Sequence, residues 1–193
     1  VRSRGLGDVY KRQLYRDGRP LLIDVGVETY SKKTFSPQRY EIWTMQSGWH
    51  NLPQFDPDGA KYDQQPGAAF AAADVTVTDA LDGLAMDLAP AYGSVPGLGR
   101  YRRSVHLTDT GLTLRDETDY PGTVALTLMS VEKPVISGAC VHLGTLAEVK
   151  TDGAAKILVE SVPITDARLR QAWPDTLYRT RVYFCGTLSV EVW

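Results

Sequence analysis

Short segments in which apolar and polar residues alternate recur along this chain, and they constrain its fold more than any other feature. A period of two is typical of strands that place one side on a core and the other in water. Turn signals such as Thr110-Gly111 and Asp152-Gly153 separate most of the segments. About ten or more strands at this spacing favour an all-β fold, an antiparallel β-sandwich with little helix, over a parallel α/β sheet. The expected strands span residues 74–78, 84–88, 102–107, 112–116, 124–131, 142–149, 156–162, 177–184 and 188–193.

The pattern begins with a predicted hairpin. Residues 14–15 and 20–25 flank Arg16-Asp17-Gly18-Arg19, where Asp-Gly is a strong signal for a tight turn between strands. Residues 28–53 are irregular and rich in aromatic and hydroxyl side chains. Residues 54–69 contain two prolines and two glycines, which predicts a loop.

The charge balance argues against one class of partner. The chain has 21 Lys and Arg against 23 Asp and Glu, a net charge of −2, which gives no support to a nucleic-acid partner. No apolar run approaches the roughly 18 residues of a membrane span, so no membrane partner is expected. The sequence does not fix a compartment, although a secreted or periplasmic location is favoured over a cytoplasmic one.

Several chemically capable side chains are expected to be structural. We interpret Cys140 and Cys185, both in apolar strand-like surroundings, as two buried free thiols, with a single disulfide as the alternative. Neither has a second thiol at the spacing of a zinc site. His106 and His142 fall in alternating segments and are expected at structural or surface positions, and Arg102-Arg103 is expected on a solvated strand face.

The first thirteen residues differ in character from everything that follows. Residues 1–13 read VRSRGLGDVYKRQ, which is basic and has neither strand nor helix periodicity. The string also resembles translated adapter sequence at the broken ends of gene predictions. We therefore interpret residues 1–13 as non-native or disordered, with an ordinary basic tail as the alternative. Residues 14–193 are then the β-sandwich domain.

Candidate functional residues concentrate between Leu21 and Asn51. Asp24 follows three apolar residues and precedes Gly26, and a carboxylate at the end of a buried strand needs a partner. His50 stands between Trp49 and Asn51. Aspartate and histidine together can ligate zinc, but two ligands are too few for a site. Hydrogen-bonded structural roles for both residues are the alternative.

The runs LLIDVGVETY and FSPQRYEIWTMQSGWHN resemble the C-terminal β-sandwich of heparinase II/III-like polysaccharide lyases. The resemblance is close from residue 21 to 51 and weaker through the later strands. It implies a structural zinc, with Asp24 and His50 as two of its ligands. The third ligand in that family comes from a motif of the type H-N-D-V-G. In register, the histidine of that motif falls at Leu6, which cannot bind a metal, so one zinc ligand is expected to be missing from this chain.

The resemblance also implies a partner domain. Lyases of this family carry a helical toroid before the sandwich, which supplies the other wall of the substrate cleft. No segment here has a helical pattern long enough to form it. We therefore expect the chain to be the sandwich portion of a longer lyase, to act with that protein's own N-terminal helical domain, and to have no lyase activity alone. A non-catalytic carbohydrate-binding sandwich or a structural sandwich is the alternative.

The implied chemistry is β-elimination at a uronic acid, with an acidic polysaccharide or oligosaccharide as the substrate. A base removes the C5 proton, an acid protonates the leaving glycosidic oxygen, and a positive group must stabilise the charge that develops. Tyr40 and Tyr30 are the catalytic candidates, because both lie close in sequence to basic residues. Ordinary aromatic packing is the alternative for each.

The substrate-binding candidates are Arg39, Asn51 and Trp49. Arg39 suits an acidic sugar, and Trp49 could stack on a sugar ring. A turn role for Asn51 and core packing for Trp49 are the alternatives.

Overall fold

The computed structural model describes residues 13–80, 82–93 and 95–193. These residues form antiparallel sheets joined by turns, with short 3-10 helices and no α-helix among them. The all-β sandwich expected from the alternating pattern is therefore confirmed.

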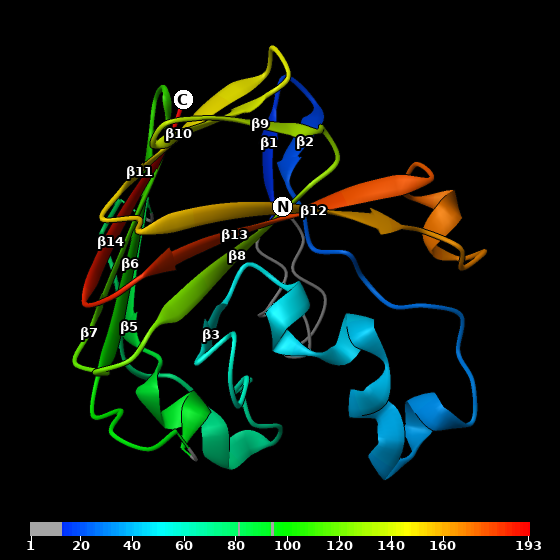
Figure 1. The fold of residues 1–193 in the computed structure, drawn as a ribbon, viewed down its shortest axis with the longest axis horizontal. Coiled ribbons are helices and arrows are strands. Elements are labelled where there is room, and N and C mark those ends of the chain that lie inside the picture. Colours follow the sequence, from blue (N-terminus) through cyan, green and yellow to red (C-terminus); the bar gives the residue numbers. More distant parts are fainter. Residues whose placement is uncertain (1–12, 81, 94) are drawn as a thin grey trace.

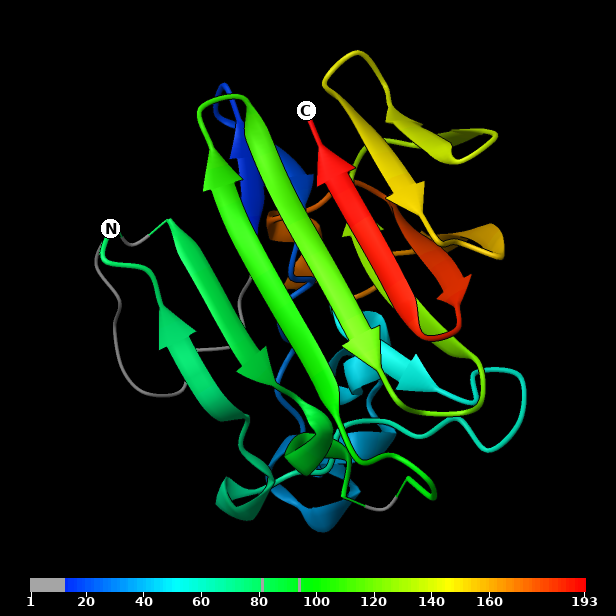
Figure 2. The same cartoon turned by 90° about the vertical axis from the view of Figure 1, so that its left-hand side faces the viewer.

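The larger of the two main sheets has eight strands in the order β4-β5-β6-β7-β14-β11-β10-β9, seen face-on in Figure 2. In that order the strands are β4 (Ala73–Val77), β5 (Gly83–Asp87), β6 (Tyr101–Thr108), β7 (Gly111–Thr118), β14 (Thr187–Val192), β11 (Ala147–Asp152), β10 (Cys140–Leu143) and β9 (Pro134–Ser137).

The smaller sheet has four strands in the order β12-β13-β8-β3 and packs against the larger one (Figure 1). Its strands are β12 (Lys156–Pro163), β13 (Thr176–Phe184), β8 (Val124–Ser130) and β3 (Pro53–Phe55). A separate hairpin pairs β1 (Leu14–Arg16) with β2 (Arg19–Leu22). The 3-10 helices are η1 (Lys33–Phe35), η2 (Pro37–Glu41), η3 (Trp43–Met45), η4 (Ser47–Trp49), η5 (Ala68–Phe70), η6 (Ala89–Tyr92) and η7 (Leu169–Gln171).

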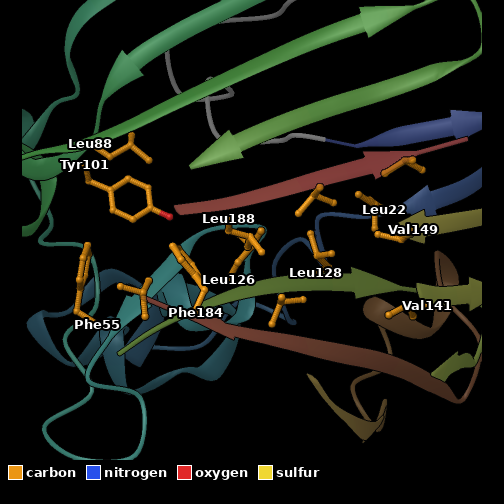
Figure 3. Packing of buried hydrophobic residues seen from close by; sticks show 14 of the residues in the cluster. Leu22, Phe55, Leu88, Tyr101, Leu126, Leu128, Val141, Val149, Phe184 and Leu188 are labelled. Atoms are coloured by element: carbon orange, nitrogen blue, oxygen red, sulfur yellow. The ribbon is translucent and has the colours of Figure 1, made fainter. Parts of the chain in front are cut away.

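The main core lies between the two sheets. In Figure 3, Leu188 from the large sheet and Leu126 and Phe184 from the small sheet point into the same apolar layer, and all three are fully buried. Tyr101 and Phe55 pack edge to face at one end of this layer, with 5.5 Å between the ring centroids. The inward-facing positions of the alternating segments therefore supply this core.

A second apolar layer covers the other side of the small sheet. Met129 of β8 and Leu177 of β13 join Ile23 and Val25 there, and Trp43 packs against this cluster. The 3-10 helices η1 to η4 lie on this side, at the lower right of Figure 1. Every residue of β8 is buried as a result. The fold thus has three layers: the large sheet, the small sheet, and the irregular segment that carries the predicted site.

The hairpin and most strands lie where the sequence predicted them. Asp17 and Gly18 have φ of 50° and 75°, as a tight two-residue turn requires. Residues 142–149, expected as one strand, instead belong to the hairpin of β10 and β11, which turns at Gly144 with φ of 57°. The predicted loop at residues 54–69 begins with β3, whose short run is too brief to show a period.

Two expectations about single residues were wrong. Arg103 is buried, because the alternation that turns Tyr101 inward also turns Arg103 inward and leaves Arg102 exposed. Cys140 and Cys185 are free thiols, as predicted, but Cys140 is half-buried and Cys185 is exposed. Cys185 lies in the connection between β13 and β14, so its side chain is not buried in the sheet. None of the helices in the described ranges is long and apolar enough to cross a membrane.

Candidate functional site

Backbone contacts with β8 position the start of the site segment. The Ile23 N–H donates to the carbonyl of Met129 at 2.9 Å, which extends the sheet by one bond before the chain leaves it. Gly26 has φ of 82°, a conformation that favours glycine, and its N–H donates to Asp24 Oδ1 at 2.9 Å. The carboxylate of Asp24 is thereby fixed at the point where the chain turns away from the sheet.

The return of the segment brings His50 to Asp24. The successive 3-10 helices are closed by backbone bonds such as His50 N–H to the carbonyl of Ser47 at 3.0 Å. His50 Nδ1 then lies 3.2 Å from Asp24 Oδ2, although 26 residues separate them in sequence. Their side chains are 20% and 7% exposed, so the contact is largely shielded from water.

The surroundings of His50 favour its charged form. Burial alone would lower the pKa of His50, but the hydrogen bond to Asp24, the negative charge of Asp24 and the Thr44 carbonyl together raise the pKa above its usual value. Nδ1 faces the Asp24 carboxylate and Nε2 lies 3.1 Å from the Thr44 carbonyl, so both ring nitrogens face acceptors. An imidazolium satisfies both contacts by donating from each nitrogen.

The same geometry bears on the predicted zinc site. Asp24 and His50 are the right kinds of ligand and they lie together, but they are two residues where a structural zinc needs about four donors. Residues 13–80, 82–93 and 95–193 contain no group of three or more His, Cys, Asp or Glu that could hold a metal ion. These residues alone therefore do not fit a zinc ion. The expectation that Leu6 replaces the third ligand lies outside the described residues.

A cavity of about 350 Å³ opens beside the Asp24–His50 pair. Arg39 and Tyr40 line it as well, so four of the predicted site residues share one space. The Arg39 guanidinium carbon lies 5.5 Å from the centre of the Tyr40 ring, and the Tyr40 side chain is 45% exposed. The rest of the wall comes from Gly26, Val27, Met45, Ser47, Leu52, Gln64, Gln65, Pro66, Gly67 and Phe70.

This arrangement offers part of the set of groups that acid–base chemistry on an anion requires. The cavity carries one phenol, one guanidinium and one imidazole held against a carboxylate. A phenol can donate or accept a proton, and cations can bind an acidic substrate and stabilise developing negative charge.

Tyr30 and Trp49 lie outside this cavity. Tyr30 is exposed, with the Arg168 guanidinium carbon 4.4 Å from its ring centre and Phe35 packed edge-on at 5.4 Å. Trp49 packs edge to face on Trp43 at 5.1 Å and lies under the guanidinium of Arg179 at 4.3 Å. Both rings are used in packing.

Asn51 is held by the protein itself. Its Nδ2 donates to the carbonyl of Ile23 at 3.2 Å, and its Oδ1 accepts from the Met129 N–H at 2.9 Å. The side chain therefore ties the two ends of the site segment to β8.

Sequence reasoning missed two contributors to the site. The wall formed by Gln64 to Gly67 and Phe70 lies in and just after the predicted loop, and nothing in its composition distinguishes it from other loops. Arg103 donates to the carbonyl of Asn51 at 2.9 Å from the large sheet. Its inward register, two residues after the apolar Tyr101, is the signal that could have revealed it.

Comparisons with known proteins identify the fold. No protein-family model matches the chain, and no curated protein matches it. Among solved structures, heparinase III has a TM-score of 0.59 at 19% identity over 93% of this chain and 28% of that one. A mutant of a heparan sulfate lyase from Pedobacter heparinus has a TM-score of 0.60 at 14% identity, over 94% of this chain and 29% of that one. The chain therefore shares its fold with part of these proteins and spans less than a third of their length.

Proposed function

We propose that this chain is the β-sandwich module of a polysaccharide lyase that cleaves uronic-acid-containing glycans by β-elimination. The observation that carries the proposal is one cavity that gathers Tyr40, Arg39 and the Asp24–His50 pair. The fold shared with heparinase III supports the same conclusion, since that protein is named for its action on heparin-type glycans.

The residues of the cavity have distinct roles in this proposal. Tyr40 transfers the proton, either from C5 of the uronate or to the leaving glycosidic oxygen. Arg39 binds the uronate carboxylate and lowers the cost of the negative charge that forms as the C5 proton leaves. The electron pair of the C5–H bond then forms the C4–C5 double bond while the C4–O bond breaks. Protonation of that oxygen releases a fragment with a new reducing end and leaves an unsaturated uronate at the non-reducing end of the other fragment.

A second domain completes the site in this proposal. The cavity holds one phenol, whereas the elimination needs both a base and an acid. The chain also covers only 28% of heparinase III. We assign the remaining groups to a helical domain of the same protein, so the 193-residue chain is inactive alone.

Zinc belongs to the assembled protein in this proposal. Asp24 and His50 supply two donors, and the remaining donors come from outside residues 13–193. The test is metal content after dialysis: the complete protein is expected to retain about one zinc per chain, and Asp24→Asn is expected to lose it. A complete protein without bound zinc would refute this part.

Activity is tested by absorbance of the unsaturated uronate product. The complete protein from the parent gene is assayed on a panel of acidic polysaccharides, beside the 193-residue chain alone. Tyr40→Phe is expected to lower kcat/KM by about 10²-fold or more, which is typical of losing a general acid or base. Tyr15→Phe is the matched control, because Tyr15 is equally exposed but lies on the β1–β2 hairpin outside the cavity.

Two results would overturn the proposal. Turnover by the 193-residue chain alone would remove the need for a second domain. A complete protein that is folded but inactive on every uronic-acid glycan would remove the lyase assignment.

A further inference from the structure

A fully buried ion pair connects the large sheet to the candidate site. Arg103 on β6 and Asp116 on β7 face each other in register and are 1% and 0% exposed. The guanidinium holds the carboxylate in a forked contact, with Nε to Oδ1 at 2.7 Å and Nη2 to Oδ2 at 2.6 Å. The Tyr101 hydroxyl adds a third donor to the carboxylate, at 2.6 Å from Oδ2. The pair is therefore closely fixed inside an apolar core.

The remaining arm of Arg103 leaves the large sheet. Its Nη1 donates to the backbone carbonyl of Asn51 at 2.9 Å. Asn51 follows His50 directly, so this bond fixes the chain next to one member of the Asp24–His50 pair. The Asp116 contact fixes the orientation of the guanidinium, which fixes where Nη1 points.

Asn51 passes this restraint to the other member of the pair. Its side chain donates to the carbonyl of Ile23, the residue before Asp24, and accepts from the Met129 N–H of β8. One residue thus joins the backbone beside His50, the backbone beside Asp24, and the small sheet. Arg103 holds that residue from the opposite side of the core.

A contribution to folding stability does not by itself explain why a charged pair is buried here. Burying two charges is costly, and apolar residues of similar size often replace a buried ion pair without loss. An apolar side chain could not, however, hold the Asn51 carbonyl in place. We propose that Arg103 and Asp116 form a positioning pair that holds Asn51, and through it sets the alignment of His50 with Asp24 at the cavity. The functional meaning of this alignment rests on the lyase function proposed above.

The test separates positioning from folding by comparing local and global stability. The double variant Arg103→Met with Asp116→Leu removes both charges and keeps apolar volume in the core. Its Tm is expected to fall less than that of Asp116→Leu alone, because no unpaired charge stays buried, although the Tyr101 hydroxyl and the Asn51 carbonyl lose a partner. Hydrogen exchange of the Met129 amide, which donates to Asn51, is expected to rise about 10-fold or more, while amides of the large sheet keep their rates. Arg115→Met with Glu117→Leu is the matched control, because that pair lies exposed on the same strand.

The single variant Arg103→Lys covers the case in which the double variant does not fold. A lysine keeps the positive charge beside Asp116, but one ammonium group cannot reproduce the forked contact and reach Asn51 as well. Met129 exchange is again expected to rise about 10-fold in a folded chain. Unchanged Met129 exchange in a folded variant, or a rise shared equally by all strands, would overturn the positioning role.

Activity of the complete protein distinguishes this inference from the proposed function. If the lyase assignment holds, the double variant should lower kcat by about 10²-fold, because small misalignments of catalytic groups have effects of this order. Faster Met129 exchange in a protein that shows no lyase activity would support the positioning role and refute the proposed function. Full activity together with faster exchange would overturn the link between the pair and the cavity.

Discussion

Replacing Asp24 by asparagine would test the charge contact on which the site is built. The change keeps the shape of the side chain and leaves an oxygen for the Gly26 N–H, which donates to Oδ1 at 2.9 Å. It removes the negative charge that faces His50 at 3.2 Å. The part of the loss that depends on the charge of His50 therefore reports on this contact.

The size of the effect follows from the burial of this pair. Hydrogen bonds to charged groups contribute about 1.5–3 kcal/mol to stability, and this contact is largely shielded from water. For a domain of this size, about 1 kcal/mol corresponds to about 2–4 °C in Tm. Asp24→Asn is therefore expected to lower Tm by about 3–12 °C where His50 is charged, in metal-free buffer with a chelator.

The pH dependence has a definite sign. Because the folded protein raises the pKa of His50, the contact contributes fully below the unfolded pKa of about 6.5. This contribution is lost as pH rises through the raised folded value. The Tm gap between parent and variant should therefore be widest near pH 5 to 6 and narrow toward pH 9. Thermal melts at intervals across this range measure it, and Asp109→Asn, in an exposed turn, is the control.

The reasoning would be refuted by a Tm gap that does not change with pH. It would also be refuted if Asp24→Asn melted with the parent at pH 5 to 6 while the His50 ring, followed by NMR, titrated at the same pH in both proteins. Either result would mean that the carboxylate does not stabilise a charged His50.

Three further outcomes follow from the structure. Asp116→Leu alone leaves a buried guanidinium without its carboxylate and should cost about 3–5 kcal/mol, measured by urea unfolding; a loss below about 1 kcal/mol would contradict the burial of the charge. Trp173→Phe removes the indole N–H that donates to the Val25 carbonyl at 2.8 Å and should lower stability by about 1 kcal/mol, seen as a fall of about 2–4 °C in Tm. A thiol reagent should label the exposed Cys185 before Cys140, since the hydrogen bond to Glu148 raises the pKa of Cys140; equal rates by mass spectrometry would contradict this.

The sequence predicts where the strands lie better than it predicts which sheet packs against each side of a strand. Alternation shows which residues share a side of a strand, and it predicts the strand at 102–107 that the structure has as β6. It does not show which sheet faces that side. The burial of Arg103 is therefore not predicted, although Arg103 lies on the same side of its strand as Tyr101. The short strand β3 carries only three residues, too few for a period to show.

The candidate site was predicted in part. The residue types of Asp24 and His50 make both candidates, the family resemblance pairs them as zinc ligands, and the structure brings them into contact. Tyr40 and Arg39 share their cavity, whereas Tyr30 is occupied by Arg168 on another surface. Consecutive 3-10 helices have no single period, so the sequence does not show which tyrosine of the segment lines the cavity. The position of each tyrosine depends on contacts between segments that are distant in the sequence.

Because β8 is buried on both sides, the solubility of the domain depends on the site segment that covers one of them. The residues that place Asp24 and His50 are the same ones that shield Met129 and Leu177 from water. Deleting or loosening the segment would leave a flat apolar sheet surface open to other chains. Aggregation therefore limits the changes that this segment can tolerate, whatever chemistry its polar side chains perform. The presence of this segment in a sequence is thus evidence for the fold and is not by itself evidence for catalysis.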